Sequence, residues 1–248
     1  MPPTEFNQQE FDLAYPPGVE FNYWTVARNR ILWRALARQG WLTGEWVEVG
    51  CGRGIVLQFL RQRGLEVRGV ELAPVQALPQ VAGHVLTGVD VCDLPAVERA
   101  RPQGVLLLDV IEHLPDPVAF LQRLRESLPG VQRWLVTVPA HPELWSNYDE
   151  FYGHQRRYTA AVLEEQLTAA GLRPLVTRHF FHALYPAARL LLGSGRQRAV
   201  KITAPPAWQR PLHQALGLGF ALESSLLPAT WPGTSLMCLA ETAAGQPR

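Results

Sequence analysis

Short apolar runs alternate along the chain with longer segments in which apolar residues recur at helical spacing. The runs predict strands at 46–49, 66–71, 84–87, 104–109, 134–138, 175–181 and 235–241. Residues 104–109 are apolar almost throughout, which is typical of a central parallel strand that is covered on both faces. Because strands and helices alternate, the pattern predicts an α/β fold with a doubly wound, mainly parallel, Rossmann-like sheet.

The helices are predicted from their end signals as well as from their spacing. They cover 21–39 before Gly40, 55–63 before Gly64, a segment from Asp116-Pro117 to about Leu128, and 160–170 after Thr159. Pro74 and Pro79 follow the second predicted strand, so the helix expected there should be short or broken.

The chain is expected to form a single domain over residues 1–248. Residues 1–40 would be a proline-rich lead-in and the N-terminal helix, 41–181 the core, and 234–241 the last strand. Residues 182–233 form an insertion with two strongly apolar stretches, 187–192 and 212–227. We expect this insertion to be helical and to act as a lid over the site, which would suit a hydrophobic substrate.

Composition narrows the classes of function. The 248 residues carry a formal net charge of +1, which gives no electrostatic basis for a nucleic-acid partner. Basic residues are few around the apolar insertion, so peripheral membrane contact is not favoured. The three cysteines are widely spaced and show no metal-binding or disulfide pattern, which favours a reducing cytoplasmic setting without a metal. Neither a secretory signal nor a membrane-spanning segment is predicted.

The most informative residues follow the first predicted strand. Gly50, Gly52 and Gly54 occupy alternate positions between that strand and a helix, an arrangement that brings bare backbone against a ligand. The next strand ends in Glu71, whose carboxylate can accept hydrogen bonds from both hydroxyls of a ribose. Together these features predict a nucleoside site.

The spacing of the glycines and an extra acid separate two nucleotide classes. A dinucleotide site prefers Gly-x-Gly-x-x-Gly, whereas this chain has Gly-x-Gly-x-Gly with Glu48 just before it. That carboxylate would repel a pyrophosphate but suits a ligand with an ammonium group. S-adenosylmethionine has an ammonium and a sulfonium and no phosphate, so it is the favoured cofactor, and an NAD-dependent oxidoreductase is the alternative.

The segment 47–54 resembles the first motif of the class I S-adenosylmethionine-dependent methyltransferases. Residues 69–71 resemble their ribose-binding strand end, 90–95 their adenine-contacting segment, and 109–117 a motif of the small-molecule group that includes the quinone-biosynthesis methyltransferases. The resemblance implies a seven-stranded sheet whose last strand is antiparallel. It also implies a set of cofactor-binding residues: Glu48, Gly50, Gly52, Gly54, Glu71, Leu72, Asp90, Val91, Asp109 and Val110.

Polar side chains that suit catalysis gather after the fifth predicted strand. His154 is the candidate base, with Asp149 as its orienting acid. The candidates for substrate binding are His113, His141, Arg157 and Tyr158. The alternative for this group is a network in which Arg156 and Arg157 pair with carboxylates and fix the loop.

The sequence thus predicts an enzyme that transfers a methyl group to a small molecule, which can be hydrophobic, with oxygen as the preferred acceptor atom. A non-catalytic interaction protein with the same fold is the remaining alternative. The oligomeric state and the identity of the acceptor are open at this point.

Overall fold

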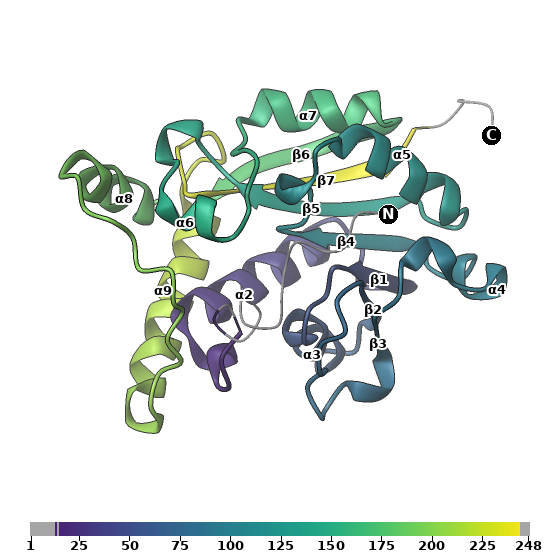
Figure 1. Ribbon diagram of the computed structural model, residues 1–248, viewed down its shortest axis with the longest axis horizontal. Coiled ribbons are helices and arrows are strands. Elements are labelled where there is room, and N and C mark those ends of the chain that lie inside the picture. The colour runs from purple at the N-terminus through teal and green to yellow at the C-terminus, as the bar shows by residue number, and fades with distance from the viewer. Residues whose placement is uncertain (1–12, 14, 244–248) are drawn as a thin grey trace.

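The computed structural model describes residues 13 and 15–243, so most of the expected lead-in at residues 1–12 lies outside the described part. A single seven-stranded sheet runs through the molecule in the order β3-β2-β1-β4-β5-β7-β6 (Figure 1). The strands are β1 (Glu45–Val49), β2 (Glu66–Glu71), β3 (Val85–Thr87), β4 (Gly104–Leu108), β5 (Arg133–Pro139), β6 (Leu172–Phe180) and β7 (Ser235–Thr242).

The first five strands pair in parallel, and β7 pairs antiparallel with both β5 and β6. The predicted fold class, with seven strands and an antiparallel last strand, is therefore confirmed. Strand β6 begins three residues earlier than expected, because Leu172, Arg173 and Pro174 already pair with β7 before an irregularity at Pro174/Val176. That irregularity interrupts the alternation of side chains between the two faces from which a strand is predicted, so the sequence pattern did not reveal the first three residues of β6.

Helices cover the sheet on two sides (Figure 1). One side packs on α2 (Tyr23–Arg38), α3 (Ile55–Arg61) and α9 (Arg210–Leu226), and the other on α5 (Pro117–Ser127) and α7 (Ala160–Ala169). Alternate residues of each central strand face opposite sides: Leu106 and Leu108 join the first core, and Val105 and Leu107 the second. All four are buried.

The cap signals in the sequence correspond to observed helix ends. The Asp116 side chain accepts a hydrogen bond from the Ala119 backbone N–H at 3.0 Å, with Pro117 at the first helical position. Thr159 caps α7 through the Val162 backbone N–H. Between β2 and β3, by contrast, the chain forms no α-helix and only the short 3₁₀ turn Ala82–His84, because Pro74 and Pro79 prevent the backbone from continuing a helix.

Two short helices were not foreseen from the sequence: α4 (Ala96–Arg99) and α6 (Asn147–Phe151). Both have only four or five residues, which is too few to show a helical repeat in the apolar pattern.

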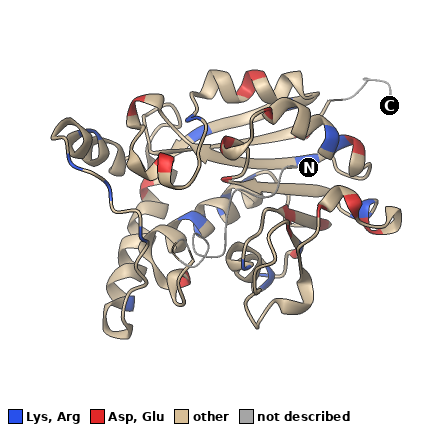
Figure 2. Cartoon of the chain, viewed as in Figure 1, with Lys and Arg blue, Asp and Glu red and all other residues tan. Residues whose placement is uncertain are grey.

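The insertion contains α8 (Leu184–Gly193), a linking segment, and α9. Helix α9 lies against α2: the buried Gly217 contacts Val26, and Arg34 Nη1 donates to the Ala221 carbonyl at 2.6 Å. Arg210 and Glu223 are the charged residues of α9, and it is almost uncoloured in Figure 2. Within the described residues, no helix has the length and hydropathy that a membrane crossing needs.

The strand order places a ligand site. The chain runs from β1 outward through β2 and β3, then returns to β4 on the other side of β1. At such a switch point the loops that follow the carboxyl ends of adjacent strands separate and leave a crevice. The segments after β1, β2 and β4 begin at Gly50, Leu72 and Asp109, so the predicted site residues lie at this edge.

Candidate functional site

The glycine turn after β1 has the conformation that the sequence predicts. Gly50, Gly52 and Gly54 have φ angles of 74°, 54° and 82°, in the left-handed region that other residues rarely adopt. A Cβ on Gly50 would lie 2.8 Å from Val110 Cγ2, so the loop after β4 approaches the turn too closely for any side chain there. The turn therefore exposes backbone at the mouth of the crevice.

Glu48 is a buried carboxylate directly before this turn. It is 3% exposed, and its Oε2 has no hydrogen-bond partner among the described residues. Burial raises the pKa of Glu48 to about 8, although Arg28 and the Leu57 backbone act in the opposite direction. A carboxyl group in this state is stabilised by any cationic group that comes within reach.

Glu71 binds the glycine turn itself. Its Oε2 accepts from the Gly52 backbone N–H at 2.8 Å and its Oε1 from the Ala73 backbone N–H at 2.9 Å. Burial, only partly offset by these hydrogen bonds, raises the pKa of Glu71. Each carboxylate oxygen has a second lone pair, so the predicted ribose contact is compatible with these bonds. It stays a prediction.

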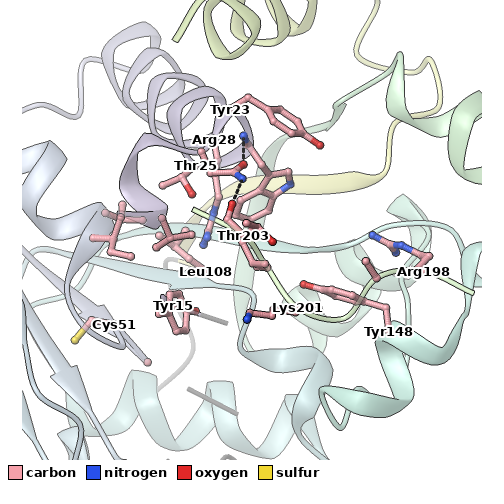
Figure 3. Close-up of a pocket in the computed structure, with 18 of the residues that line it drawn as sticks. Tyr15, Tyr23, Thr25, Arg28, Cys51, Leu108, Tyr148, Arg198, Lys201 and Thr203 are labelled. Carbon is pink, nitrogen blue, oxygen red and sulfur yellow. Dashed lines mark hydrogen bonds between the residues drawn. The ribbon is translucent and has the colours of Figure 1, made fainter. Parts of the chain in front are cut away.

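A cavity of about 300 Å³ opens beside the turn (Figure 3). Its walls come from the start of α2, the ends of β1 and β4, the start of α3, α6, and the link between α8 and α9. Aromatic rings form much of the wall, and the polar groups include Glu48 and Arg28; the aromatic residues are Tyr15, Tyr23, Trp24 and Tyr148. The cavity thus combines aromatic rings with one acidic side chain, Glu48, and three basic ones, Arg28, Arg198 and Lys201.

Arg28, which lines the cavity, forms an ion pair with Asp109. Arg28 Nη2 lies 3.1 Å from Asp109 Oδ2, and the Thr137 hydroxyl donates to Asp109 Oδ1 at 3.2 Å. The Arg28 guanidinium also lies 4.9 Å from the Trp24 ring centre. Asp109 has a positive φ of 57°, a conformation that aspartate tolerates better than most residues. Asp109 therefore holds the Arg28 guanidinium at the cavity wall.

The cavity is closed on one side by residues 198–203, between α8 and α9. Asn147 exchanges two hydrogen bonds of 2.9 Å with the Arg198 backbone, and the Tyr152 hydroxyl donates to the Val200 carbonyl at 2.6 Å. Asn22 Nδ2 donates to the Thr203 carbonyl at 3.2 Å. Hence the link between the two insertion helices, rather than the helices, lines the cavity.

Asp149 and His154, the predicted catalytic pair, are in contact. His154 Nδ1 lies 2.8 Å from Asp149 Oδ1, and Arg157 Nε lies 2.8 Å from the same oxygen. The other Asp149 oxygen accepts from the Ser146 backbone N–H and hydroxyl. Burial alone would raise the pKa of Asp149, but the hydrogen bond from His154 and the charge of Arg157 outweigh it and lower the pKa.

The His154 ring does not line the cavity. Its centre lies 6.4 Å from that of Tyr148, which does line it. One aromatic side chain therefore separates the predicted base from the cavity, and its catalytic role stays a prediction.

The predicted substrate-binding residues are placed less favourably. Tyr158 is fully buried and its hydroxyl donates to the Ile111 carbonyl, while Arg157 is buried and bonded to Asp149 and the Ala140 carbonyl. The alternative interpretation, a network in which arginine fixes the loop, describes Arg157 in this structure. Both side chains are enclosed by protein, and a role for Arg157 and Tyr158 in substrate binding stays a prediction.

His113 and His141 also lie outside the cavity lining. The His141 ring stacks on His179 at 4.9 Å and lies 4.6 Å from the Tyr185 ring. The His113 ring meets His154 edge-on, with 4.8 Å between centres. A role for either in substrate binding stays a prediction.

The residues predicted to hold the adenine also have contacts within the protein. Asp90 Oδ1 accepts from the Cys92 backbone N–H, and Oδ2 pairs with Arg123 Nη2 at 3.0 Å. Val91 is buried, whereas Leu72 is 36% exposed and Val110 packs against Gly50. Among these, the adenine contacts of Asp90 and Val91 stay predictions.

Sequence reasoning did not single out several residues that line the cavity. Tyr15, Tyr23, Thr25 and Thr203 carry no motif, and their distance along the chain from Gly50 hides their proximity to it. Tyr148 and Arg198 had weak signals, as one of several aromatic residues after β5 and as a basic residue beside an apolar stretch. Contacts between remote segments decide these positions, and the local pattern does not encode them.

A family model described as a methyltransferase domain matches residues 24–177, more than half of the chain. The chain belongs to this methyltransferase family. The match includes the glycine turn, Glu71, the segment after β4, and the Asp149–His154 pair, but not the insertion. The matched region therefore includes the carboxyl ends of β1 and β4, beside which the cavity opens.

Two curated relatives are named ubiquinone biosynthesis O-methyltransferase, from Leptothrix cholodnii and Pseudomonas paraeruginosa. Each is 32% identical to this methyltransferase-family chain, over 107 and 115 residues. The matches cover 39% and 42% of this chain and 45% and 49% of the relatives. The chain thus spans about half the length of the curated relatives it matches.

Solved methyltransferase structures share the fold. The 1,6-didemethyltoxoflavin-N1-methyltransferase of Burkholderia thailandensis, solved with 1,6-didemethyltoxoflavin and S-adenosylhomocysteine, is 18% identical with a TM-score of 0.55, over 95% of this chain and 87% of that one. A putative sarcosine dimethylglycine methyltransferase from Galdieria sulphuraria is 14% identical with a TM-score of 0.54, over 87% and 85% of the two chains. At these identities the likeness establishes the fold.

Proposed function

We propose that the protein is an S-adenosylmethionine-dependent methyltransferase that acts on a small, largely apolar molecule and transfers the methyl group to oxygen. The observation that carries the proposal is the pairing of the glycine turn with Glu48, a buried carboxylate whose Oε2 has no partner among the described residues. A cationic, nucleoside-containing ligand satisfies both features, whereas a dinucleotide would place a pyrophosphate beside an acid.

The polar side chains in and beside the cavity are complementary to the polar groups of this cofactor. Glu48 would hold the ammonium group, and the Arg28 guanidinium at the same wall would meet the carboxylate of the methionine part. Glu71 does not line the cavity itself; it lies at the end of β2 against the glycine turn and would accept from the ribose hydroxyls. When bound, S-adenosylmethionine would supply a methyl group activated by a sulfonium; the protein has to orient the acceptor and remove its proton.

The acceptor class follows from the lining and from the relatives. Tyr15, Tyr23, Trp24 and Tyr148 offer apolar faces to a ring or a chain. The matched relatives are named as O-methyltransferases, which favours an oxygen acceptor. Residues 198–203 would act as the lid that the insertion was expected to provide.

His154 is the proposed proton acceptor, with Asp149 as its positioning residue. The 2.8 Å contact assigns the Nδ1 proton to the Asp149 side, which leaves Nε2 as the accepting nitrogen. A His154→Gln variant should lose turnover while it keeps its affinity for S-adenosylhomocysteine.

Partners and location belong to this proposal too. A small-molecule acceptor without nucleic acid is consistent with the net charge of +1. All three cysteines are unpaired thiols, as a reducing cytoplasm requires. Peripheral membrane contact is not part of the proposal, although Leu212, Leu222 and Leu226 on α9 are more than half exposed.

Calorimetric titration of S-adenosylhomocysteine into the purified protein tests the cofactor, with NAD as the competitor. We expect micromolar binding that NAD does not displace and that Glu48→Gln weakens. Glu66→Gln, on the exposed start of β2, is the matched control. Binding of NAD in place of S-adenosylhomocysteine would refute the interpretation of the glycine turn.

A further inference from the structure

Glu112 is the most unusual charged residue in the described part of the molecule. It is fully buried in the short 3₁₀ turn after β4, and neither carboxylate oxygen has a hydrogen-bond partner among the residues that the structure describes. A carboxyl group removed from water in this way is destabilised unless it is neutral or meets a cation.

The cations around Glu112 are paired with other acids. Arg28 and Arg157 are close enough to influence Glu112, but Arg28 pairs with Asp109 at 3.1 Å and Arg157 with Asp149 at 2.8 Å. The group thus has three carboxylates and two arginines, so an ionised Glu112 would have no counter-ion of its own among these side chains.

Two imidazoles face this carboxylate. The ligand atoms of Glu112, His113 and His154 all lie within 4.8 Å of one another. Donor atoms about 2.1 Å from a tetrahedral ion are roughly 3.4 Å apart, so a movement of about 1 Å by each side chain would close the set. The two histidine rings meet edge-on with 4.8 Å between their centres.

The surrounding contacts resemble those around bound ions in general. Metal-binding histidines usually direct their other nitrogen at a carboxylate or a backbone carbonyl. Here His154 Nδ1 is bound by Asp149, and backbone groups of Tyr152 and Gly153 hold the His113 ring. Both rings are therefore oriented before any ion arrives.

The two loops that supply these residues are fixed to each other. The Gln155 backbone N–H donates to the Glu112 carbonyl at 2.9 Å, and Gln155 Nε2 donates to the His113 carbonyl at 3.0 Å. Arg156 donates to the Pro115 carbonyl at 3.0 Å. One backbone hydrogen bond and two side-chain hydrogen bonds thus hold the loops that carry the ligands against each other.

We propose that Glu112, His113 and His154 form a binding site for a divalent transition-metal ion, one layer behind Tyr148. Two imidazoles and one carboxylate suit zinc, cobalt or manganese better than magnesium, which prefers oxygen ligands. Three protein ligands leave at least one coordination position open. The ion would supply the positive counter-charge that an ionised Glu112 needs, and it would join the loops after β4 and β5.

The site bears on the proposed function at one point only. Coordination through Nε2 of His154 would occupy the nitrogen proposed to accept the proton of the acceptor. An occupied metal site and a His154 base would therefore exclude each other. Metal binding itself does not rest on the proposed function and is measured without any substrate.

Equilibrium dialysis of the chelator-treated full chain against Zn²⁺, followed by metal analysis, tests the proposal, and Co²⁺ absorption reports the ligand geometry. We expect one ion per chain and a tetrahedral or five-coordinate cobalt spectrum. Glu112→Gln and His113→Asn should each weaken binding more than about 100-fold, since even outer partners of metal sites contribute 10- to 100-fold. Asp149→Asn should weaken it less, about 10-fold or more, by releasing the His154 ring.

The control is His84→Ala, which removes an exposed histidine on the far edge of the sheet and should leave binding unchanged. Circular dichroism spectra show whether each variant is folded. Glu112→Gln keeps the size of the side chain and removes a buried charge, so it should fold. Absence of a bound ion in the wild type, or binding that Glu112→Gln and His113→Asn leave intact, would overturn the proposal. Loss of S-adenosylhomocysteine binding would bear on the proposed function and not on the metal site.

Discussion

Two glycines of α9, two positions apart, should respond differently to replacement by alanine. Gly217 is buried against α2, where a new Cβ would overlap Val26 Cγ1 and lie 2.7 Å from Val26 Cβ and 3.0 Å from the Tyr23 carbonyl oxygen. Gly219 is exposed, and a Cβ there meets no atom within 4 Å. Both lie inside the same helix, so the gain in helix propensity is shared.

The magnitudes follow from this geometry. Replacing glycine by alanine within a helix stabilises by about 1 kcal/mol, and forcing a methyl group into a filled contact costs about 1–3 kcal/mol. Gly219→Ala should therefore stabilise the protein, and Gly217→Ala should leave it unchanged or destabilise it by up to about 2 kcal/mol. For a chain of this size the two melting temperatures should differ by roughly 2–12 °C.

Thermal unfolding followed by circular dichroism checks the difference. Val26→Ala removes Cγ1, the nearest of the three atoms that the new methyl group would meet, so a double-mutant cycle between Val26→Ala and Gly217→Ala should give a coupling free energy of about 1 kcal/mol. Equal melting temperatures for Gly217→Ala and Gly219→Ala would refute the close packing of α9 on α2.

Three further predictions concern the site. Asp149→Asn should lower the free energy of unfolding by about 3–5 kcal/mol, because it leaves the buried Arg157 without a counter-ion; Glu150→Gln, an exposed neighbour, should change it by less than about 0.5 kcal/mol in the same urea titration. Since the folded state lowers the pKa of Asp149, the stability that its ionised form contributes is present above the unfolded pKa of about 3.9 and is lost as the pH falls through the folded value. Gly50→Ala should weaken S-adenosylhomocysteine binding by about tenfold or more, as its left-handed turn then costs roughly 1–2 kcal/mol; an unchanged Kd would contradict this. Glu48 is protonated below a pH of about 8, so a cationic ligand should release a proton between the ordinary pKa of 4.5 and that value; calorimetry in two buffers of different ionisation enthalpy should detect the release in the wild type and not in Glu48→Gln.

The sequence predicted the features that depend on neighbouring residues. The Asp116 and Thr159 caps and the left-handed glycines follow from local sterics and hydrogen bonding, and the structure shows each of them. The contact between Asp149 and His154 was also predicted, because the two residues lie only five positions apart in one loop.

Features that join remote segments were not predictable in the same way. Gln155 brings the loop after β5 against the turn after β4, and without that contact the sequence shows no metal-ligand spacing for Glu112, His113 and His154. Likewise Asn22 and Thr203 are 181 positions apart, so their hydrogen bond at the cavity has no trace in the local pattern. Arg157 and Tyr158 suggested substrate contacts by residue type, and their burial is decided by how the loop packs.

The position of β7 has a consequence for synthesis of the chain. It lies between β5 and β6, although it is the last of the three to be translated. Until residues 235–242 have left the ribosome, β5 and β6 each present an unpaired edge that can join strands of other chains. A nascent chain that pauses in the α8–α9 insertion would remain in this state. Chaperone protection should therefore matter most during translation of residues 182–234.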